Sequence, residues 1–468
     1  PPSIWGCSGR RMGRSMAAVQ AHRQRQGPRG ARGRAEDAQA FEAAAPGLRK
    51  ALGAALRPGP GDCFDARVGE RGLDSLAAGP FRFALAPGEG RQVVAATGAD
   101  RPRRSLARSV VEGDVLHLCL DDDGAPRLDP APWAQAAAVV LENATGRVLA
   151  LVGGTDPQPG GYVRATQAKR QPGSTFKAFV YAAALQDGLS PVDRVWSTPR
   201  AEDGEDPPDP GPTLHDALAQ SVNEAAVHLY RGRAPGAVRD IAAALGVRTP
   251  LRDDASVALG SSELTPMDLA SAYAALARMG VPVEPSFVDR LVDVDGNEVG
   301  RRGGPVALGA GADLPGAPGP RALDDGVARA LVGMLEGVVD AGTGRAAFRG
   351  DRARAGKTGT TNDHVDAWFV GMTPAHTVAV WVGADDRLPL GSGEYGGRAA
   401  LPAWVAIVQA LGEDPEARFG PAPNAVRVPV RGRWHWLPRD RVPASVLRPP
   451  EPGPAPLLPF GAGRRPAR

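Results

Sequence analysis

The sequence patterns typical of β-strands fall in two groups, one at each end of a long helical segment. This arrangement constrains the fold of the chain more than any other feature of the sequence. Strands are predicted at Ala136–Glu142, Arg147–Val152, Arg354–Thr361, Val365–Met372 and His376–Gly383. Between the two groups, helices are predicted at Ser174–Leu185, Leu214–Tyr230, Thr265–Met279 and Leu323–Val339. Strands that are so far apart in the sequence share one hydrophobic core only if they pair in the same sheet. We therefore predict one sheet assembled from distant pieces of the chain, an α+β layered domain, over 134–412.

The remaining residues form three further parts. Residues 61–133 predict a small all-β module, with strands at Phe81–Ala86, Arg91–Ala96 and Asp114–Leu120. Residues 1–60 form a basic arm that we expect to be mostly disordered, with a helix signal at Ala38–Leu56. Residues 413–468 are predicted to be a Pro-rich tail, and eight prolines fall in its last 26 residues.

Charge and cysteine content exclude several classes of function. The net charge is +3, but the first 35 residues carry eight Arg and no acid, so the rest is slightly acidic and no nucleic-acid partner is expected. Cys7, Cys63 and Cys119 form no CxxC pair and predict no disulfide framework. No apolar run is long enough for a membrane helix. Because the chain begins with Pro1, we expect an anchor or export signal upstream of it.

A Ser-x-x-Lys motif at Ser174 and Lys177 is the first candidate for catalysis. Residues three apart on a helix share a face, so the amine of Lys177 can reach the hydroxyl of Ser174. Pro172-Gly173 predicts that Ser174 begins the helix, where backbone N–H groups favour an anion. Only four of the 55 basic residues are Lys. An amine that acts as a base must be one of these four or the N-terminus, because Arg does not deprotonate.

Two further motifs add polar groups. Ser221-Val-Asn223 interrupts a predicted helix with two poor helix formers, which indicates a helix end or a loop facing a cleft. Lys357-Thr-Gly-Thr360 lies in a predicted strand. There Lys357, Thr358 and Thr360 offer one charge and two hydroxyls to a carboxylate, and Gly359 lets a peptide lie alongside.

The three motifs occur once each, in this order, and the first and third contain two of the four lysines. Together they resemble the active-site signature of penicillin-binding proteins and serine β-lactamases. Five segments are similar to class A high-molecular-weight penicillin-binding proteins: 164–174, 259–270, 356–363, 366–371 and 396–400. This likeness covers about 134–410, and 61–133 resembles the OB-like module that precedes the transpeptidase domain in some members.

The resemblance implies the fold of a serine penicillin-recognising transpeptidase/β-lactamase-like domain, an antiparallel sheet with helices on its faces. It also implies a D,D-transpeptidase that needs no metal or cofactor. Ser174 would be acylated by a peptidoglycan stem peptide, with Lys177 as base and the N–H groups of Ser174 and Thr360 as oxyanion hole. Ser221 and Lys357 would relay the proton to the departing D-Ala. Asn223 would hold the donor amide, and Thr358 and Thr360 its carboxylate. β-Lactams would acylate Ser174 as inhibitors.

The resemblance also implies a setting for the protein and leaves alternatives open. We expect the periplasm or the outer face of the cytoplasmic membrane, donor and acceptor stem peptides, and a possible cell-wall synthesis complex. Residues 1–60 are too short for the glycosyltransferase domain of full-length relatives, so polymerising activity is expected to be absent. An acidic loop at 201–212 departs from the relatives' pattern. A D,D-carboxypeptidase, a β-lactamase, or a penicillin-binding sensor or scaffold without turnover remain alternatives.

Other residues are assigned structural roles. The seven His show no metal-site spacing, so no zinc site is predicted. Gly342-Thr-Gly344 lacks the strand–helix frame of a nucleotide site. Asp363, His364 and Asp366 predict a turn with solvated charges. Glu263 is assigned to a structural helix segment, and Trp368 and Phe369 to a core strand.

Overall fold

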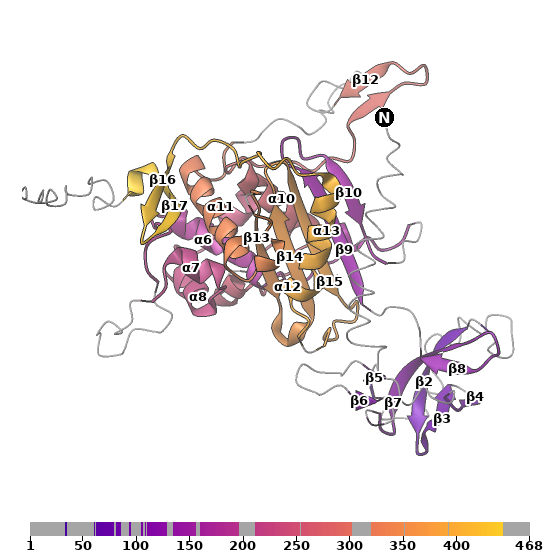
Figure 1. Ribbon diagram of the computed structural model, residues 1–468. Coiled ribbons are helices and arrows are strands. Elements are labelled where there is room, and N and C mark those ends of the chain that lie inside the picture. Colours follow the sequence, from indigo (N-terminus) through magenta and orange to yellow (C-terminus); the bar gives the residue numbers. More distant parts are fainter. Residues whose placement is uncertain are drawn as a thin grey trace, which may run out of the picture.

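A computed structural model describes most of the chain (Figure 1). It covers residues 62–78, 81–85, 110–128, 134–155, 160–195, 211–252, 254–301, 320–350, 352–391 and 393–442, with short stretches at 33–34, 93–94 and 104–105 and single residues 60 and 108. The helix expected at Ala38–Leu56, residue Cys7 and most of the acidic loop lie outside these residues.

One five-stranded antiparallel sheet organises the larger domain, as predicted. Its strand order is β10-β9-β15-β14-β13. The strands are β9 (Gln135–Glu142), β10 (Val148–Val152), β13 (Ala355–Thr360), β14 (Asp366–Met372) and β15 (His376–Gly383). β15 pairs with β9 over eight residues, which joins the two ends of the helical segment. β13 is the edge strand, so one side of its backbone is open to a further strand.

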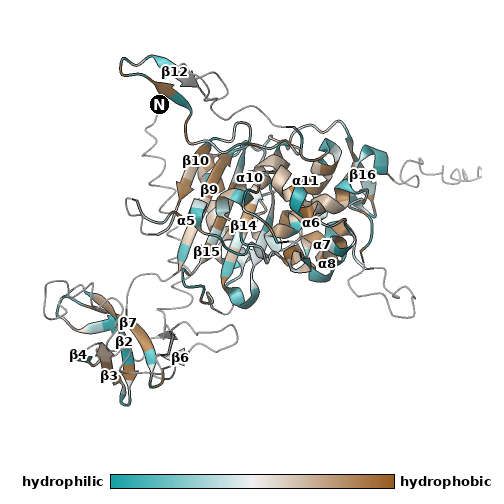
Figure 2. Cartoon of the chain, turned by 180° about the vertical axis from the view of Figure 1, so that it is seen from behind, coloured by the Kyte–Doolittle hydropathy of each residue, from teal (hydrophilic) through white to brown (hydrophobic). Residues whose placement is uncertain are grey.

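The sheet is covered on both faces. Successive residues of β9 alternate between two hydrophobic clusters: Ala137, Val139 and Leu141 belong to one, and Ala136, Ala138 and Val140 to the other. A strand buried on both faces is apolar along its length, and β9 is brown over much of its length in Figure 2. Helices α6 (Lys177–Gln186), α10 (Pro266–Ala277) and α11 (Asp325–Asp340) share the first cluster, and α13 (Leu401–Leu411) shares the second.

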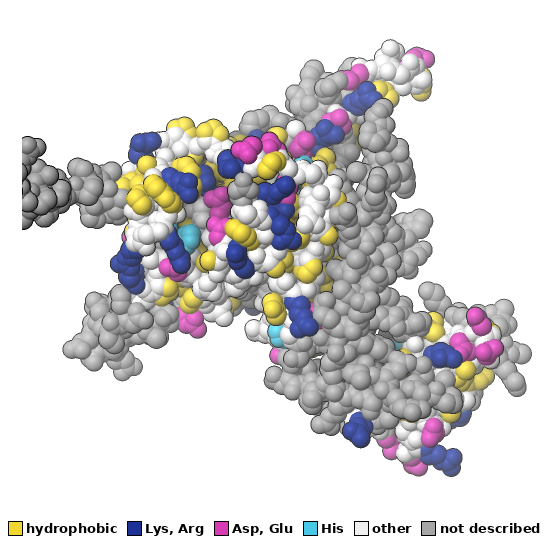
Figure 3. All heavy atoms as spheres, in the orientation of Figure 1, with side chains coloured by type: hydrophobic (Ala, Val, Ile, Leu, Met, Phe, Trp, Pro, Cys, Tyr) yellow, Lys and Arg dark blue, Asp and Glu magenta, His cyan; other side chains and the backbone are white. Residues whose placement is uncertain are grey.

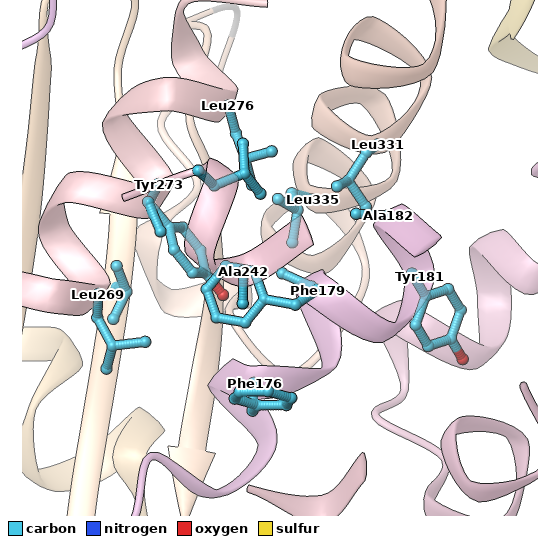
Figure 4. Packing of buried hydrophobic residues seen from close by; sticks show 14 of the residues in the cluster. Phe176, Phe179, Tyr181, Ala182, Ala242, Leu269, Tyr273, Leu276, Leu331 and Leu335 are labelled. Atoms are coloured by element: carbon cyan, nitrogen blue, oxygen red, sulfur yellow. The ribbon is translucent and has the colours of Figure 1, made fainter. Parts of the chain in front are cut away.

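The helices of this domain have the following bounds: α5 Arg164–Gln167, α6 Lys177–Gln186, α7 Leu214–Ala219, α8 Asn223–Arg231, α9 Ala237–Ala244, α10 Pro266–Ala277, α11 Asp325–Asp340, α12 Gly396–Ala399 and α13 Leu401–Leu411. α6 is buried on nearly all sides. In Figure 4, Phe179 of α6 lies near Tyr273 of α10 and Leu335 of α11. The capping box of Thr265 and Asp268 begins α10, as the sequence Thr-Pro indicates. Among the described residues, no helix is both long and apolar enough to cross a membrane.

The N-terminal module is all-β, as predicted. Its sheet has the order β1-β7-β2-β3-β4, and β8 pairs with β7; the members are β1 Gly33–Arg34, β2 Cys63–Gly69, β3 Gly72–Ala78, β4 Phe81–Phe83, β7 Asp114–Leu120 and β8 Pro126–Leu128. A separate pair joins β5 (Val93–Val94) to β6 (Arg104–Ser105). The basic arm therefore contributes one short strand to this sheet.

The prediction of no disulfide was wrong. Cys63 and Cys119 form a disulfide across the paired strands β2 and β7. The two cysteines are 56 residues apart, and only the strand register places them opposite each other. A spacing rule for CxxC pairs therefore does not detect this bond.

The Pro-rich tail predicted over 413–468 was wrong for its first 30 residues. Residues 413–442 include a hairpin of β16 (Ala425–Val430) and β17 (Arg433–Pro438) that packs on α11. Its alternating apolar residues and the turn Arg431-Gly432 are strand signals, whereas the prolines concentrate beyond Val442. A second two-stranded hairpin joins β11 (Arg290–Val292) to β12 (Glu298–Arg301).

Candidate active site

Ser174 lies in a tight turn that approaches the edge strand β13. The turn is a 3-10 helix, Gly173–Phe176, that continues directly into α6, so the predicted α-helix begins three residues later than expected. Gly173 has φ of +53°, and a Cβ there would lie 2.7 Å from the carbonyl oxygen of Thr360. Only glycine permits this approach. Ser174 is partly exposed, and its hydroxyl has no hydrogen-bond partner among the described residues.

Lys177 begins α6 and is fully buried. Its Nζ donates to the carbonyl oxygen of Ser221 at 2.6 Å and to Oδ1 of Asn223 at 2.6 Å, and it lies 3.3 Å from Oγ of Ser221. Burial lowers the pKa of Lys177 to about 8, although the carboxylate of Glu224 opposes this shift. Near neutral pH, part of the Lys177 population is therefore a neutral amine.

The Ser221–Asn223 segment is a break between two helices. The single helix predicted at Leu214–Tyr230 was wrong: α7 ends at Ala219 and α8 begins at Asn223. Ser221 has φ of +59°, which a helix does not contain. The poor helix formers Ser221 and Asn223 did indicate this break, and both side chains face Lys177.

Lys357 approaches Ser221 from the opposite side. Its Nζ donates to Oγ of Ser221 at 2.9 Å and to the carbonyl oxygen of Thr358 at 3.2 Å. Lys357 is fully buried, and burial together with the nearby charge of Lys177 lowers its pKa well below the usual range. The Ser221 hydroxyl thus lies between two buried amines, which is an arrangement for passing a proton.

The two threonines of β13 have different partners. Oγ1 of Thr358 is 2.7 Å from Oγ1 of Thr343. Oγ1 of Thr360 accepts a hydrogen bond from the backbone N–H of Gly396 at 3.0 Å, which leaves its own proton free to donate. The sequence analysis did not assign Thr343 to the site. Gly342, the residue before Thr343, passes close to α7. A Cβ at Gly342 would lie 2.2 Å from the carbonyl oxygen of Ala219.

Glycines allow two segments that are distant in sequence, 259–270 and 396–400, to pack closely against the catalytic motifs. A Cβ at Gly260 would lie 2.2 Å from the carbonyl oxygen of Gly173, and a Cβ at Gly396 would lie 2.4 Å from that of Gly359. A Cβ at Gly359 would lie 2.4 Å from the carbonyl oxygen of Pro172. The segments 259–270 and 396–400 therefore pack against the Ser174 turn and β13 through backbone contacts.

Two of the structural assignments, those of Glu263 and Asp366, were wrong. Trp368 and Phe369 are fully buried in β14, as predicted. Glu263 lies in the loop before α10 rather than in a helix, and it forms an ion pair with Arg387. Asp366 is buried and accepts a hydrogen bond from Nε1 of Trp381 at 2.8 Å, so the predicted solvated charge was wrong there. The apolar residues that follow Asp366 continue β14, which carries it into the core. Among the described residues, no group of three His, Cys, Asp or Glu could hold a metal.

Comparison with known proteins identifies the family of the larger domain. The profile of the penicillin-binding protein transpeptidase domain matches residues 136–409. The chain belongs to this family. Penicillin-binding protein 1A of Pseudomonas aeruginosa is 32% identical over an alignment of 379 residues that covers 69% of this chain and 46% of the relative. Penicillin-binding protein 1A of Neisseria gonorrhoeae is 38% identical over an alignment of 326 residues that covers 66% of this chain and 38% of the relative. The chain thus spans less than half the length of these relatives.

Two solved structures are similar to this penicillin-binding protein. Penicillin-binding protein 1A of Haemophilus influenzae has a TM-score of 0.62 at 23% identity, over 92% of this chain and 71% of that chain, and supports the fold alone. The PonA1 protein of Mycobacterium tuberculosis, solved in complex with penicillin V, has a TM-score of 0.52 at 27% identity, over 62% of this chain and 82% of that chain. The expected class A resemblance is confirmed.

Proposed function

We propose that this chain is a D,D-transpeptidase that links peptidoglycan stem peptides through an acyl-enzyme on Ser174. One observation carries the proposal: the Ser221 hydroxyl lies within hydrogen-bond distance of both buried lysines. Beside them, the Ser174 hydroxyl has no partner among the described residues. A nucleophile, a base and a proton path are thus gathered at the open edge of β13.

The acylation step follows from these positions. The neutral amine of Lys177 takes the proton of Ser174 while Oγ bonds to the carbonyl carbon of the penultimate D-Ala. The N–H groups of Ser174 and Thr360 stabilise the oxyanion. The C–N bond then breaks, and the departing D-Ala amine receives a proton through Ser221, with Lys177 and Lys357 on either side. An acceptor amine then attacks the carbonyl carbon of the acyl ester and loses a proton through Ser221. The bond from the carbonyl carbon to Oγ of Ser174 breaks, and Ser174 regains its proton.

The donor peptide binds along β13. Its backbone pairs with the open edge of the strand, where Gly359 presents no side chain. Its terminal carboxylate accepts from the hydroxyls of Thr358 and Thr360, and Asn223 binds the donor amide. A bound carboxylate also favours the ammonium form of Lys357, because an opposite charge raises the pKa of a buried amine. Binding of the correct donor thus restores the charge of Lys357.

Thr343 orients the Thr358 hydroxyl, and its replacement has a measurable effect. We expect Thr343→Val to slow acylation of Ser174 by benzylpenicillin about two- to tenfold, which corresponds to one hydrogen bond. Thr343→Ser keeps the hydroxyl and should restore the rate. Stopped-flow acylation of both variants checks this. A penicillin methyl ester lacks the carboxylate, so a loss of the same size with the ester would contradict the assignment.

The setting outside the cytoplasm is also part of the proposal. Stem peptides occur on the outer side of the cytoplasmic membrane, and the Cys63–Cys119 disulfide suits an oxidising compartment. Assembly into a cell-wall synthesis complex is proposed on the family resemblance. No nucleic-acid partner and no cofactor enter the mechanism.

A donor-and-acceptor assay separates the transpeptidase from its alternatives. With a D-Ala-D-Ala stem peptide as donor, we expect D-Ala release to rise as an acceptor amine is added, and mass spectrometry to detect the joined product. Release that does not depend on the acceptor would indicate a carboxypeptidase. Rapid steady-state hydrolysis of penicillin would indicate a β-lactamase. A stable penicilloyl adduct without D-Ala release from any donor would indicate a sensor or scaffold.

A further inference from the structure

A large groove lies between α7, α11 and the β16–β17 hairpin. Its volume is about 1300 Å³. Sites for small molecules are usually about 300–1000 Å³, so this groove has room for a longer ligand. None of the residues of the three catalytic motifs lines it. The hairpin falls in the segment predicted from the sequence to be a Pro-rich tail, to which no role was assigned.

The groove is strongly basic. Eight arginines and three acidic residues line it, and Lys and Arg side chains gather around it in Figure 3. Some of these arginines belong to the framework. Arg433 pairs with Asp216 of α7 at 2.9 Å, and Arg329 pairs with Glu336 within α11 at 3.1 Å. These pairs leave a surplus of positive charge on the groove surface.

Three exposed arginines provide the surplus: Arg418, Arg427 and Arg431. Within the described part of the chain, none of them has a carboxylate within ion-pair distance. Arg418 donates only to the carbonyl oxygens of Pro415 and Ala417. Arg guanidinium groups bind carboxylates in a bidentate manner, so these side chains are suited to an acidic ligand.

Aromatic groups lie beside these charges. Trp434 is 58% exposed, and the guanidinium of Arg427 lies 5.3 Å from its ring centre. The buried Nδ1 of His435, which also lines the groove, has no hydrogen-bond partner among the described residues. Trp and Arg together are typical of the residues that contribute most at protein interfaces. The exposed ring of Trp434 offers an apolar contact, which a polymer that carries only charges, such as polyphosphate, would not use.

We propose that this groove docks an acidic peptide segment of a partner protein. The carboxylates pair with Arg418, Arg427 and Arg431, and an apolar side chain of the peptide packs on Trp434. The groove adjoins the catalytic centre without entering it: Ala219 and Gln220 of its wall directly precede Ser221. The partner therefore binds while Ser174 is acylated, which makes docking independent of the transpeptidase chemistry.

Fluorescence anisotropy of the full chain tests the proposal. The probe is a short fluorescein-labelled peptide rich in Glu and Asp that contains Leu and Trp, and the protein is first acylated with benzylpenicillin. We expect saturable binding that weakens with salt. The double variant Arg418→Glu/Arg427→Glu should raise Kd at least about fivefold. Arg290→Glu, an exposed Arg on the other two-stranded hairpin, is the matched control and should change Kd less than about twofold.

The remaining outcomes either contradict the proposal or require a replacement variant. Equal Kd values for the double variant and Arg290→Glu would overturn the proposal, as would polyphosphate binding that the peptide does not displace. If the double variant is not acylated by fluorescent penicillin, and so has not folded, Arg431→Glu in the hairpin turn replaces it. Binding that appears only after Glu202, Asp203, Glu205 and Asp206 are neutralised would make the chain's own acidic loop the occupant and overturn a partner peptide.

Discussion

Replacing Ser174 by Ala will abolish covalent labelling by a fluorescent penicillin. The variant lacks the oxygen atom that we propose forms the acyl bond, so we expect the labelling rate to fall at least about a thousandfold. Ser174 lies in the 3-10 turn that leads into α6 and packs against β13, its hydroxyl has no partner among the described residues, and Ala fits the same backbone. Gel fluorescence and peptide mapping of the wild-type chain should find the label on the peptide that contains Ser174.

Two variants control this experiment. Ser286→Ala changes a hydroxyl that donates to the carbonyl oxygen of Val288, before β11, and should label like the wild type. Ser221→Ala should slow labelling while the label stays on Ser174, because the role we propose for Ser221 is to pass protons and not to bond to the ligand. A label that persists in Ser174→Ala would assign the nucleophile to another residue.

Replacing Lys177 by Arg will slow acylation at least about 100-fold, the usual scale for loss of a general base. Arg keeps the positive charge but offers no neutral nitrogen near pH 7. Lys357→Arg should have a milder effect, because docking a carboxylate requires charge more than deprotonation. Stopped-flow measurement with benzylpenicillin gives both rates. A fall of less than about threefold for Lys177→Arg would limit Lys177 to an electrostatic role.

The pH profile distinguishes a base from a merely structural lysine. The reactive form of Lys177 is the neutral amine, and the pKa of Lys177 is about 8 because burial disfavours the ammonium. Acylation by the wild type should therefore rise about tenfold per pH unit below this value and level off above it. Lys177→Arg should lose this rise. Lys169→Arg, the same change at an exposed lysine nearby, should keep both the rate and the profile. Thermal unfolding of each variant reports whether a slow rate reflects misfolding.

Local patterns predicted most elements of the larger domain. The strands β9, β14 and β15 were predicted within two residues of their ends, because strands buried on both faces are nearly continuous apolar runs. The Ser221–Asn223 break was indicated by side chains that compete for backbone hydrogen bonds. Two neighbouring features were not predicted, the 3-10 turn at Ser174 and the tight turn of Ser221 within this break. Both depend on positive φ values that contacts with other segments stabilise.

The sequence by itself determined which chemical groups the site contains: a serine one turn from a lysine, a Ser-x-Asn break, and a lysine with two threonines on a strand. It also indicated the family, since these motifs are short and keep their order. Only the tertiary structure decided which groups meet. Ser221 lies between Lys177 and Lys357, Thr343 reaches Thr358, and Cys63 bonds to Cys119 because helix packing and strand register join residues far apart in the chain. No local pattern records such pairings, since each depends on the geometry of the whole core.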